Sequence, residues 1–244
     1  MNPAADPRER ARAVRAMFSA IAPTYDLLNR ILSFGVDRGW RRELVRRIPG
    51  DARRILDLAC GTGDVALEIR KQRPGARVYG ADFALPMLRA GVPKLRRRGA
   101  DGSILLQNAS AEDLPYAPDT FDAATIAFGI RNVARRERAL EELHRVLRPG
   151  GVLLVLDFSL PRSAGLAALY RLYFHRVLPF VGGVISGNFD AYRYLPRSVE
   201  GFPPRFRFAA MLSRAGFERP RYRDLTFGIV TLYEAAKPTG EATR

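Results

Sequence analysis

The chain has very little cysteine and histidine. Cys60 is the only cysteine among 244 residues, and there are two histidines. A single thiol cannot form an intrachain disulfide, and no cluster of Cys, His and acidic residues has metal-ligand spacing, so we expect neither a disulfide framework nor a bound metal. Cys60 adjoins a glycine turn, but no histidine lies near it in the sequence, and we interpret it as a small packed residue.

Long apolar runs are also missing. Residues 1–13 are charged and rich in alanine, unlike a signal peptide or an anchor. No later run of about 20 residues is apolar enough to form a membrane-spanning helix. The sequence therefore predicts a cytoplasmic protein, either soluble or peripheral at the inner face of the membrane.

Lysine is scarce although the chain is strongly basic. Among 40 basic residues, only Lys71, Lys94 and Lys237 are lysine, the other 37 are arginine, and the net charge is +15. Such an excess favours anionic partners, either nucleic acid or acidic lipid. Genome base composition can produce the same arginine bias, so the charge alone does not identify a partner.

A short apolar run ends in a glycine turn near the middle of the first half. Residues 53–58 have the composition of a buried parallel strand, and helical spacing follows the turn. Gly61 and Gly63 permit a sharp turn and a close approach of the backbone to a ligand at a helix N-terminus. These glycines also fit a dinucleotide-binding turn. Asp57 and Asp64 instead favour a ligand with positive charge, such as the ammonium and sulfonium of S-adenosylmethionine.

Five predicted strands alternate with helices after residue 50. The strands lie at residues 53–58, 77–82, 103–108, 121–127 and 152–158. Two further strands, at residues 217–224 and 227–236, suit an antiparallel hairpin at the sheet edge. The pattern predicts an α/β, Rossmann-like fold: a seven-stranded, mostly parallel sheet with helices on both faces. Polar residues end four strands on the expected ligand side, namely Asp57, Asp82, Asn108 and Asp157.

The segments on either side of this core are predicted to be largely helical and to belong to the same domain. We expect an N-terminal helical lid or cap at residues 1–50, or merely a packed N-terminal layer there, a cofactor-binding core at residues 51–160, and substrate-side helices with the closing strands at residues 161–244. Apolar stripes predict a helix over residues 8–34 with a break at Pro23. Another is predicted over residues 164–177, ended by Pro179 and two glycines, Gly182 and Gly183.

Six motifs are spread over nearly the whole chain. They occupy residues 18–26, 32–35, 56–64, 128–132, 148–151 and 190–195. Together they resemble the class I S-adenosylmethionine-dependent methyltransferases, and within them the ubiquinone/menaquinone biosynthesis C-methyltransferase family. The glycine turn and Arg-Pro-Gly-Gly at 148–151 are shared by many methyltransferases. The Tyr-Asp pair at 25–26, Phe-Gly-Ile-Arg-Asn at 128–132 and Ala-Tyr-Arg-Tyr-Leu at 191–195 are far more specific.

The resemblance implies methyl transfer from S-adenosylmethionine to a ring carbon of a polyprenylated hydroquinone, either demethylmenaquinol, which gives menaquinol, or a ubiquinol precursor. It implies cofactor contacts at Thr62, Asp82, Asn108 and Ala109, to which residue chemistry adds Asp57, Gly61 and Gly63. We expect Asp82 to accept the ribose hydroxyls and Asn108–Ala109 to border the adenine. Ala127 stands where many members have serine, so a hydroxyl contact to the cofactor is absent or replaced there.

Methylation of a ring carbon requires a nucleophilic ring, and therefore loss of a phenolic proton. Because a phenol with a pKa of about 10 is mostly neutral at pH 7, the site needs a base, a nearby cation or both. Arg131 is our first candidate for that cation, against the alternative of a surface salt bridge. Asp157 is the candidate base, or else an ion-pairing or capping residue. Tyr192 is a candidate for the quinone pocket, or for simple packing.

Other functions use the same residues. An RNA or other small-molecule methyltransferase would share the cofactor turn, but no nucleic-acid module is appended, and binding of nucleic acid is not expected. A dehydrogenase would need a Tyr-x-x-x-Lys pair, which is missing. Arg162, Arg171 and Arg176 flank an aromatic-rich helix and suit contact with an anionic membrane, although an ordinary solvated helix explains them equally well. The sequence leaves open a homodimer and the choice between naphthoquinone and benzoquinone.

Overall fold

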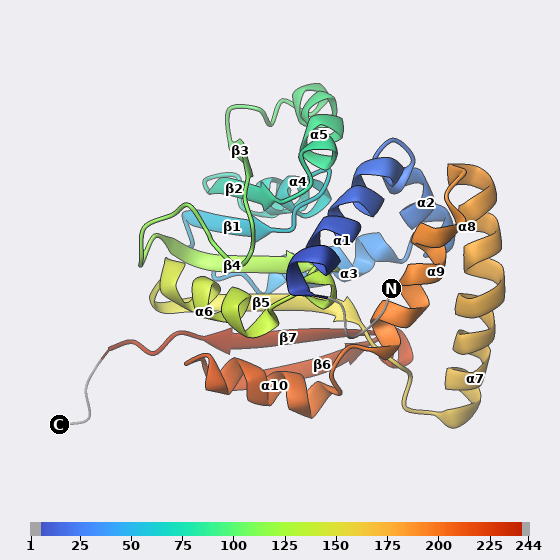
Figure 1. Cartoon of the computed structure of the whole chain (residues 1–244). Coiled ribbons are helices and arrows are strands. Elements are labelled where there is room, and N and C mark those ends of the chain that lie inside the picture. Colours follow the sequence, from blue (N-terminus) through green and yellow to red (C-terminus); the bar gives the residue numbers. More distant parts are fainter. Residues whose placement is uncertain (1–5, 241–244) are drawn as a thin grey trace.

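The computed structural model describes residues 6–240 of the protein, and within them seven strands form one sheet (Figure 1). The strands are β1 (Arg54–Leu58), β2 (Arg77–Asp82), β3 (Ile104–Asn108), β4 (Phe121–Ala127), β5 (Leu147–Phe158), β6 (Glu218–Leu225) and β7 (Val230–Ala236). Their order across the sheet is β3-β2-β1-β4-β5-β7-β6. Strands β1 to β5 pair in parallel, and β7 is antiparallel to both β5 and β6. The predicted Rossmann-like sheet with its antiparallel edge hairpin is confirmed.

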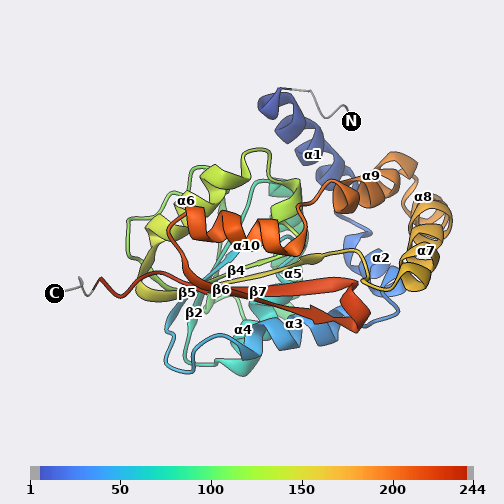
Figure 2. The same cartoon turned by 90° about the horizontal axis from the view of Figure 1, so that it is seen from below.

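Helices cover both faces of this sheet (Figure 2). One face packs against α3 (Asp37–Arg46), α4 (Asp64–Gln72) and α5 (Leu85–Arg97), and the other against α6 (Arg136–Val146) and α10 (Arg205–Arg214). The central strands are therefore shielded from water on both sides. This explains why β1 is a continuous apolar run apart from Asp57: every residue after Arg54 is buried.

A second group of helices lies beyond the carboxyl ends of the parallel strands, at the right of Figure 1. It consists of α1 (Pro7–Ile21), α2 (Tyr25–Leu32), α7 (Ala164–Leu172), a π-helical turn (Tyr173–Val177), α8 (Leu178–Ser186) and α9 (Phe189–Glu200). These helices share a small apolar core around Leu28, Phe174 and Tyr192. Segments far apart in the sequence thus meet at the edge of the sheet where the ligand is expected.

The prediction that Pro179 and two glycines end the helix after residue 164 is wrong. The chain stays helical through the π-helical turn and into α8. Pro179 is the second residue of α8, directly after the π-helical turn, and does not end the helix. Gly182 and Gly183 lie inside α8 because a Cβ there would overlap the rings of Tyr192 and Phe189. Even so, no helix within residues 6–240 is long and apolar enough to cross a membrane.

Candidate functional site

The glycine turn joins the carboxyl end of β1 to the first turn of α4. Gly61 and Gly63 have φ values of +56° and +85°, a conformation that residues with a side chain rarely adopt. The Asp82 carboxylate at the end of β2 fixes this loop, since Oδ2 accepts a hydrogen bond from the Gly61 N–H at 2.8 Å and Oδ1 accepts one from the Ala84 N–H at 2.8 Å. Each oxygen keeps a further lone pair, so Asp82 can also accept hydrogen bonds from ribose hydroxyls.

Asp57 is a buried acid whose charge is only partly compensated. It is 1% exposed, and Thr125 donates a hydrogen bond to Oδ1 at 2.9 Å, whereas Oδ2 accepts none from the residues that the structure describes. Burial raises the pKa of Asp57 to about 7. Asp57 lines a small cavity together with Gly61 and Thr62. A buried carboxylate oxygen without a partner in that cavity fits the cationic ammonium of S-adenosylmethionine.

Asp82 lines a second small cavity. Phe83, Ala109 and Gly129 help to line it, which agrees with a site for an adenine beside a ribose at Asp82. Asn108 is exposed and does not line this cavity; its side-chain amide donates to the Asp82 carbonyl at 2.7 Å. In this conformation Asn108 joins the ends of β2 and β3, and Ala109 alone of the predicted pair faces the cavity.

The structure gives Asp64 a different role from the one that the sequence predicts. Instead of offering a free charge to the ligand, its carboxylate lies 2.7 Å from Lys94 Nζ and 3.6 Å from Arg41 Nη1. Burial alone would raise the pKa of Asp64, but these two cations outweigh it and the pKa is lowered. Asp57, and not Asp64, is therefore the acid that a cationic ligand would neutralise.

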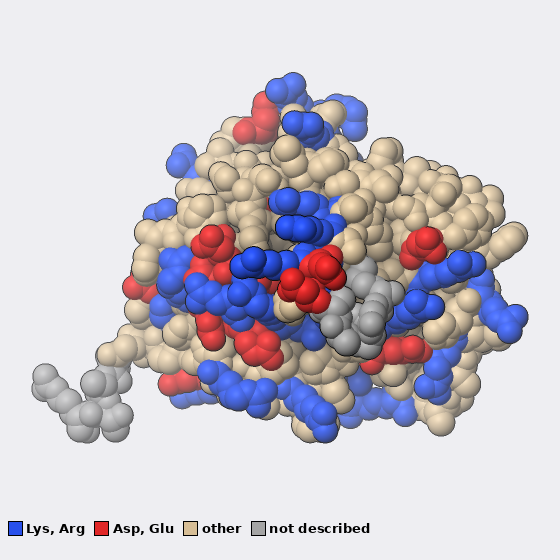
Figure 3. Space-filling view, in the orientation of Figure 1, with Lys and Arg blue, Asp and Glu red and all other residues tan. Residues whose placement is uncertain are grey.

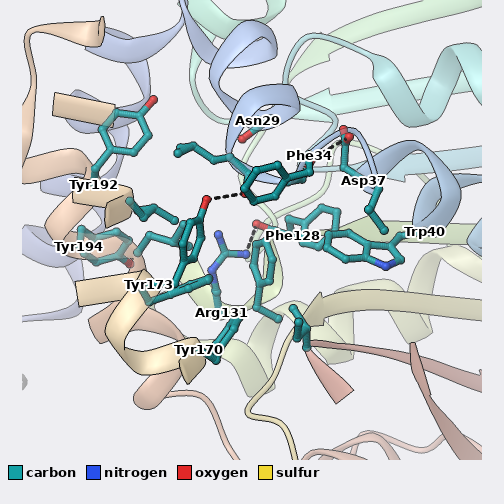
Figure 4. Close-up of a pocket in the computed structure, with 18 of the residues that line it drawn as sticks. Asn29, Phe34, Asp37, Trp40, Phe128, Arg131, Tyr170, Tyr173, Tyr192 and Tyr194 are labelled. Atoms are coloured by element: carbon teal, nitrogen blue, oxygen red, sulfur yellow. Dashed lines mark hydrogen bonds between the residues drawn. The ribbon is translucent and has the colours of Figure 1, made fainter. Parts of the chain in front are cut away.

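A larger apolar cavity of about 480 Å³ opens between the sheet edge and the second group of helices (Figure 4). Its wall carries the rings of Trp40 and of several tyrosines contributed by the helices. Tyr25, Arg41 and Phe128 line both this cavity and the small cavity at the glycine turn. The cofactor site and the apolar cavity therefore share a wall, and a ligand in one would face a ligand in the other.

Arg131 is a buried cation in the wall of the large cavity, and Figure 4 shows its guanidinium among the aromatic rings. It follows β4 in a 3₁₀ turn (Ile130–Asn132), and Nη1 donates to Asp157 Oδ1 at 2.7 Å and to the Phe128 carbonyl. Nε donates to Ser198 at 3.3 Å, and the guanidinium lies 5.3 Å from the Phe158 ring centroid. Within residues 6–240 these contacts leave Nη2 without a protein acceptor, so it can act on a ligand.

The other two predicted catalytic residues differ in their access to this cavity. Asp157 is 1% exposed and does not line the cavity; Arg131 and the Phe158 N–H occupy its oxygens. This is the ion-pairing arrangement, and it places Asp157 behind Arg131. Tyr192 does line the cavity, packed against Gly182, and burial raises the pKa of its phenol well above the usual value. Its phenol thus stays uncharged, and its ring forms part of the cavity wall.

Several residues of the site were not predicted from the sequence. Tyr25 and Asp26 belong to a motif that the sequence did show, but their contact with the glycine turn did not follow from it. Arg41 and Lys94 lie in no motif, and they reach the turn from α3 and α5. Among the described residues there is no group of three His, Cys, Asp or Glu side chains arranged to hold a metal ion.

Comparisons with known proteins agree with this geometry. The chain matches the model of the ubiE/COQ5 methyltransferase family over residues 6–237. It is 57% identical to a ubiquinone/menaquinone biosynthesis C-methyltransferase UbiE of Syntrophotalea carbinolica, over 91% of this chain and 93% of the relative. It is 54% identical to a demethylmenaquinone methyltransferase of Thermus thermophilus, over 91% of this chain and 100% of the relative.

Solved structures with a similar fold are much more distant in sequence. One is an S-adenosylmethionine-dependent methyltransferase of Thermotoga maritima, described as a possible histamine N-methyltransferase, with a TM-score of 0.64, 18% identity, and coverage of 92% of this chain and 99% of the other. Another is phosphoethanolamine N-methyltransferase 2 of Haemonchus contortus in complex with S-adenosyl-L-methionine, with a TM-score of 0.61, 12% identity, and coverage of 81% of this chain and 52% of the other. At these identities the similarity concerns the fold.

Proposed function

Because the chain belongs to the ubiE/COQ5 methyltransferase family, and is an S-adenosylmethionine-dependent methyltransferase, we propose that it methylates a ring carbon of demethylmenaquinol. The observation that carries the proposal is the apolar cavity of about 480 Å³, which contains Arg131 and shares a wall with the cofactor site. An aromatic, largely hydrophobic acceptor fits such a cavity. A soluble polar acceptor would leave its hydrogen-bonding groups against apolar side chains.

In the proposed reaction, a bond forms between the ring carbon and the methyl carbon while the methyl–sulfur bond breaks, and the ring hydrogen leaves as a proton. The cofactor supplies the methyl group on a positively charged sulfur. Asp57, Asp82 and the glycine turn would hold the cofactor on one side of the wall formed by Tyr25 and Phe128. The aromatic residues of the large cavity would orient the acceptor ring on the other side and exclude water.

We assign Arg131 the role of stabilising the phenolate form of the acceptor. A fixed cation in a site with little water lowers the pKa of a nearby phenol and makes the ring more nucleophilic. Asp157 would act as a positioning residue that holds Nη1 at 2.7 Å and so directs the rest of the guanidinium. Arg131 would therefore act on the acceptor through its charge, and Tyr192 would act only by giving the cavity its shape.

The test of the proposed function is transfer of labelled methyl from S-adenosylmethionine to three acceptors in parallel. These are a short-chain demethylmenaquinol, the corresponding ubiquinol precursor, and bulk RNA. We expect label in the demethylmenaquinol. Label only in the ubiquinol precursor would show that the acceptor is a benzoquinol and not demethylmenaquinol. Label only in RNA, or in no acceptor although S-adenosylhomocysteine binds, would reject methylation of a quinol.

We further propose that the enzyme takes its acceptor from a membrane surface. Phe34 and Leu169 line the large cavity and are also 82% and 63% exposed, so they mark its mouth. The mouth continues into an exposed apolar face on α7, the π-helical turn and α8, formed by Leu169, Leu172, Val177, Phe180, Val184 and Ile185. Figure 3 shows that the surface over α2 and α8 carries almost no charge, with blue Lys and Arg side chains below it.

The basic residues near this face favour an anionic lipid surface. Arg171 and Arg176 are exposed on α7 and the π-helical turn, and neither pairs with an acid among residues 6–240. Arg162, in contrast, forms an ion pair with Asp224, with Nε and Oδ2 2.8 Å apart. Exposed apolar side chains beside free cations are typical of surfaces that rest on anionic bilayers. A prenyl chain in the bilayer could enter the cavity mouth from such a surface.

Vesicle sedimentation tests the membrane proposal. The double variant F180D/V184D should lose at least about 10-fold of the affinity for anionic vesicles at low salt, because two charges would enter the apolar boundary. F206D is the matched control, since Phe206 is 63% exposed on α10, a helix that contributes no residue to the large cavity. Equal binding of all three proteins would reject the proposal. So would a dimeric wild type that F180D/V184D converts to a monomer, because the face would then be a subunit interface.

A further inference from the structure

Lys94 on α5 lies at the centre of a three-way contact below the glycine turn. Its Nζ donates to Asp26 Oδ2 at 2.6 Å, to Thr62 Oγ1 at 2.8 Å and to Asp64 Oδ1 at 2.7 Å. An ammonium has three N–H groups, so all of them are used. The three acceptors come from α2, the glycine turn and the start of α4, and Lys94 therefore joins three separate parts of the chain.

The contact continues toward the large cavity. Thr62 Oγ1 donates to Asp26 Oδ1 at 2.6 Å, and Arg41 on α3 lies 3.6 Å from Asp64 and also pairs with Asp37. Helices α2 and α3 also carry Tyr25 and Arg41, which line both the cofactor cavity and the large cavity. The glycine turn is thus joined to α2 by hydrogen bonds and to α3 by an ion pair, and both helices contribute to the wall of the apolar cavity.

Packing of α5 against the turn supports the same arrangement. Gly91 precedes Lys94 by three residues, and so lies on the same face of the helix. A Cβ at Gly91 would lie 2.8 Å from the Thr62 carbonyl oxygen, closer than real Cβ contacts. The helix therefore contacts the turn directly, and a movement of Thr62 on ligand binding would displace Lys94.

The residue type is informative because this chain uses arginine almost everywhere else. Of 40 basic residues, 37 are arginine and only three are lysine. A guanidinium is a planar fork that suits acceptors in one plane, whereas an ammonium directs its three donors around a point. Three acceptors on separate elements, all within 2.8 Å of one atom, require the ammonium.

We propose that Lys94 is a positioning residue that couples cofactor binding to the shape of the acceptor cavity. It does so by holding the glycine turn and α2 in one arrangement, so that a ligand at the turn also orders the cavity wall. The inference rests on the cofactor site and is independent of which acceptor is methylated. A readout based on ligand binding therefore separates its failure from a failure of the quinone assignment.

The test compares wild type, K94R and K94M, with K71R as the control because Lys71 is exposed on α4. Binding of S-adenosylhomocysteine is measured by calorimetry, and amide hydrogen exchange is measured with and without it. In wild type and K71R, the ligand should slow exchange in both the turn and helices α2 and α3. In K94R and K94M, the slowing in α2 should be lost, and affinity should fall at least about 10-fold.

Three results would overturn the proposal. One is a ligand that leaves exchange in α2 and α3 unchanged in the wild type. Another is equal slowing of α2 in wild type and K94R. The third concerns D26N, which retains Lys94 and removes the charge on α2, so that it serves if the Lys94 variants do not fold. In D26N, S-adenosylhomocysteine should slow amide exchange in α2 less than in wild type. If a D26N protein that melts normally showed the same slowing as wild type, Lys94 would have a role in folding alone.

Discussion

The cofactor edge, by which we mean the carboxyl ends of β1 to β3 and the glycine turn, differs in chemistry from the wall of the acceptor cavity. The cofactor edge is polar, and its main side chains come from strand ends and turns between Asp57 and Ala109. The cavity wall is apolar and takes residues from α1 to α3, from the ends of β4 and β5, and from α7 to α9. One site is defined by a few hydrogen bonds at fixed positions, and the other by shape and burial.

This difference determines where single substitutions should matter. A buried polar group that loses its partner costs far more than an apolar contact that is slightly altered. On the apolar side the buried charged residues are Arg131 and the paired Asp37 and Arg41. Arg131 is the one whose Nη2 is left for a ligand, and we therefore expect the largest effect there and the smallest at Cys60.

Replacement of Arg131 should have the largest effect on catalysis. R131Q should lower kcat about 10²–10³-fold, as expected when a group that stabilises developing charge is removed. Affinity for S-adenosylhomocysteine should change little, because Arg131 does not line the small cofactor cavities. Steady-state kinetics and calorimetry measure the two quantities.

R131Q also leaves Asp157 buried without its cation, which costs about 3–5 kcal/mol of stability. The double variant R131Q/D157N removes both charges and should regain much of the lost melting temperature while staying inactive. Activity that returned together with stability would show that Arg131 only supports the fold.

Asp57 should make cofactor binding depend on pH. Its pKa is raised to about 7 by burial, and a bound cation favours the charged carboxylate and so lowers that pKa. Binding therefore releases a proton below pH 7, and affinity should rise with pH up to about 7 and then level off. From pH 8 to pH 6 the affinity for S-adenosylmethionine should fall about 10-fold.

Equilibrium dialysis with labelled cofactor between pH 6 and pH 8 measures this profile. D57N should bind more weakly, and its affinity should be nearly independent of pH. Because burial also raises the pKa of Asp82, a profile that persisted in D57N would assign the titration to Asp82 instead.

The same contrast explains how much could be predicted from the sequence. The sequence could predict that Asp57, Gly61, Gly63 and Asp82 lie close together, because strand ends in a parallel sheet meet at one edge, and this depends only on local pattern. The sequence suggested that Asp64 offers its charge to a cationic ligand and did not show its pairing, because Lys94, its partner, lies 30 residues away on another helix.

The cavity wall was harder to predict because its residues meet only after several helices have packed. The motifs pointed to Tyr192, but not to the glycines of α8 against which it packs. Gly182 and Gly183 resembled a helix end in the sequence, and in the structure they make room for the Tyr192 and Phe189 rings. Local propensity was overridden by a tertiary contact.

A side chain at Gly182 should have a moderate effect on binding of the quinol and none on binding of the cofactor. In G182A the new methyl group would push α9 away from α8, at a cost of about 1–3 kcal/mol, and should raise the KM for the quinol several-fold. Affinity for the cofactor should not change. G165A is the control, because a Cβ at Gly165 on α7 meets nothing within 4 Å. Weaker cofactor binding in G182A would contradict the separation of the two sites.

Cys60 should show the smallest effect, although it lies within the glycine turn. Burial raises the pKa of its thiol well above the usual value, and the carboxylates of Asp57 and Asp82 act in the same direction. Because the thiolate is the reactive form, native enzyme should resist iodoacetamide at pH 8, and C60A should retain activity within about 3-fold. Rapid inactivation that the cofactor prevents would instead place a reactive thiol in the site. Position at the polar edge is therefore not enough: a residue there matters when its polar atoms face the ligand or hold those that do.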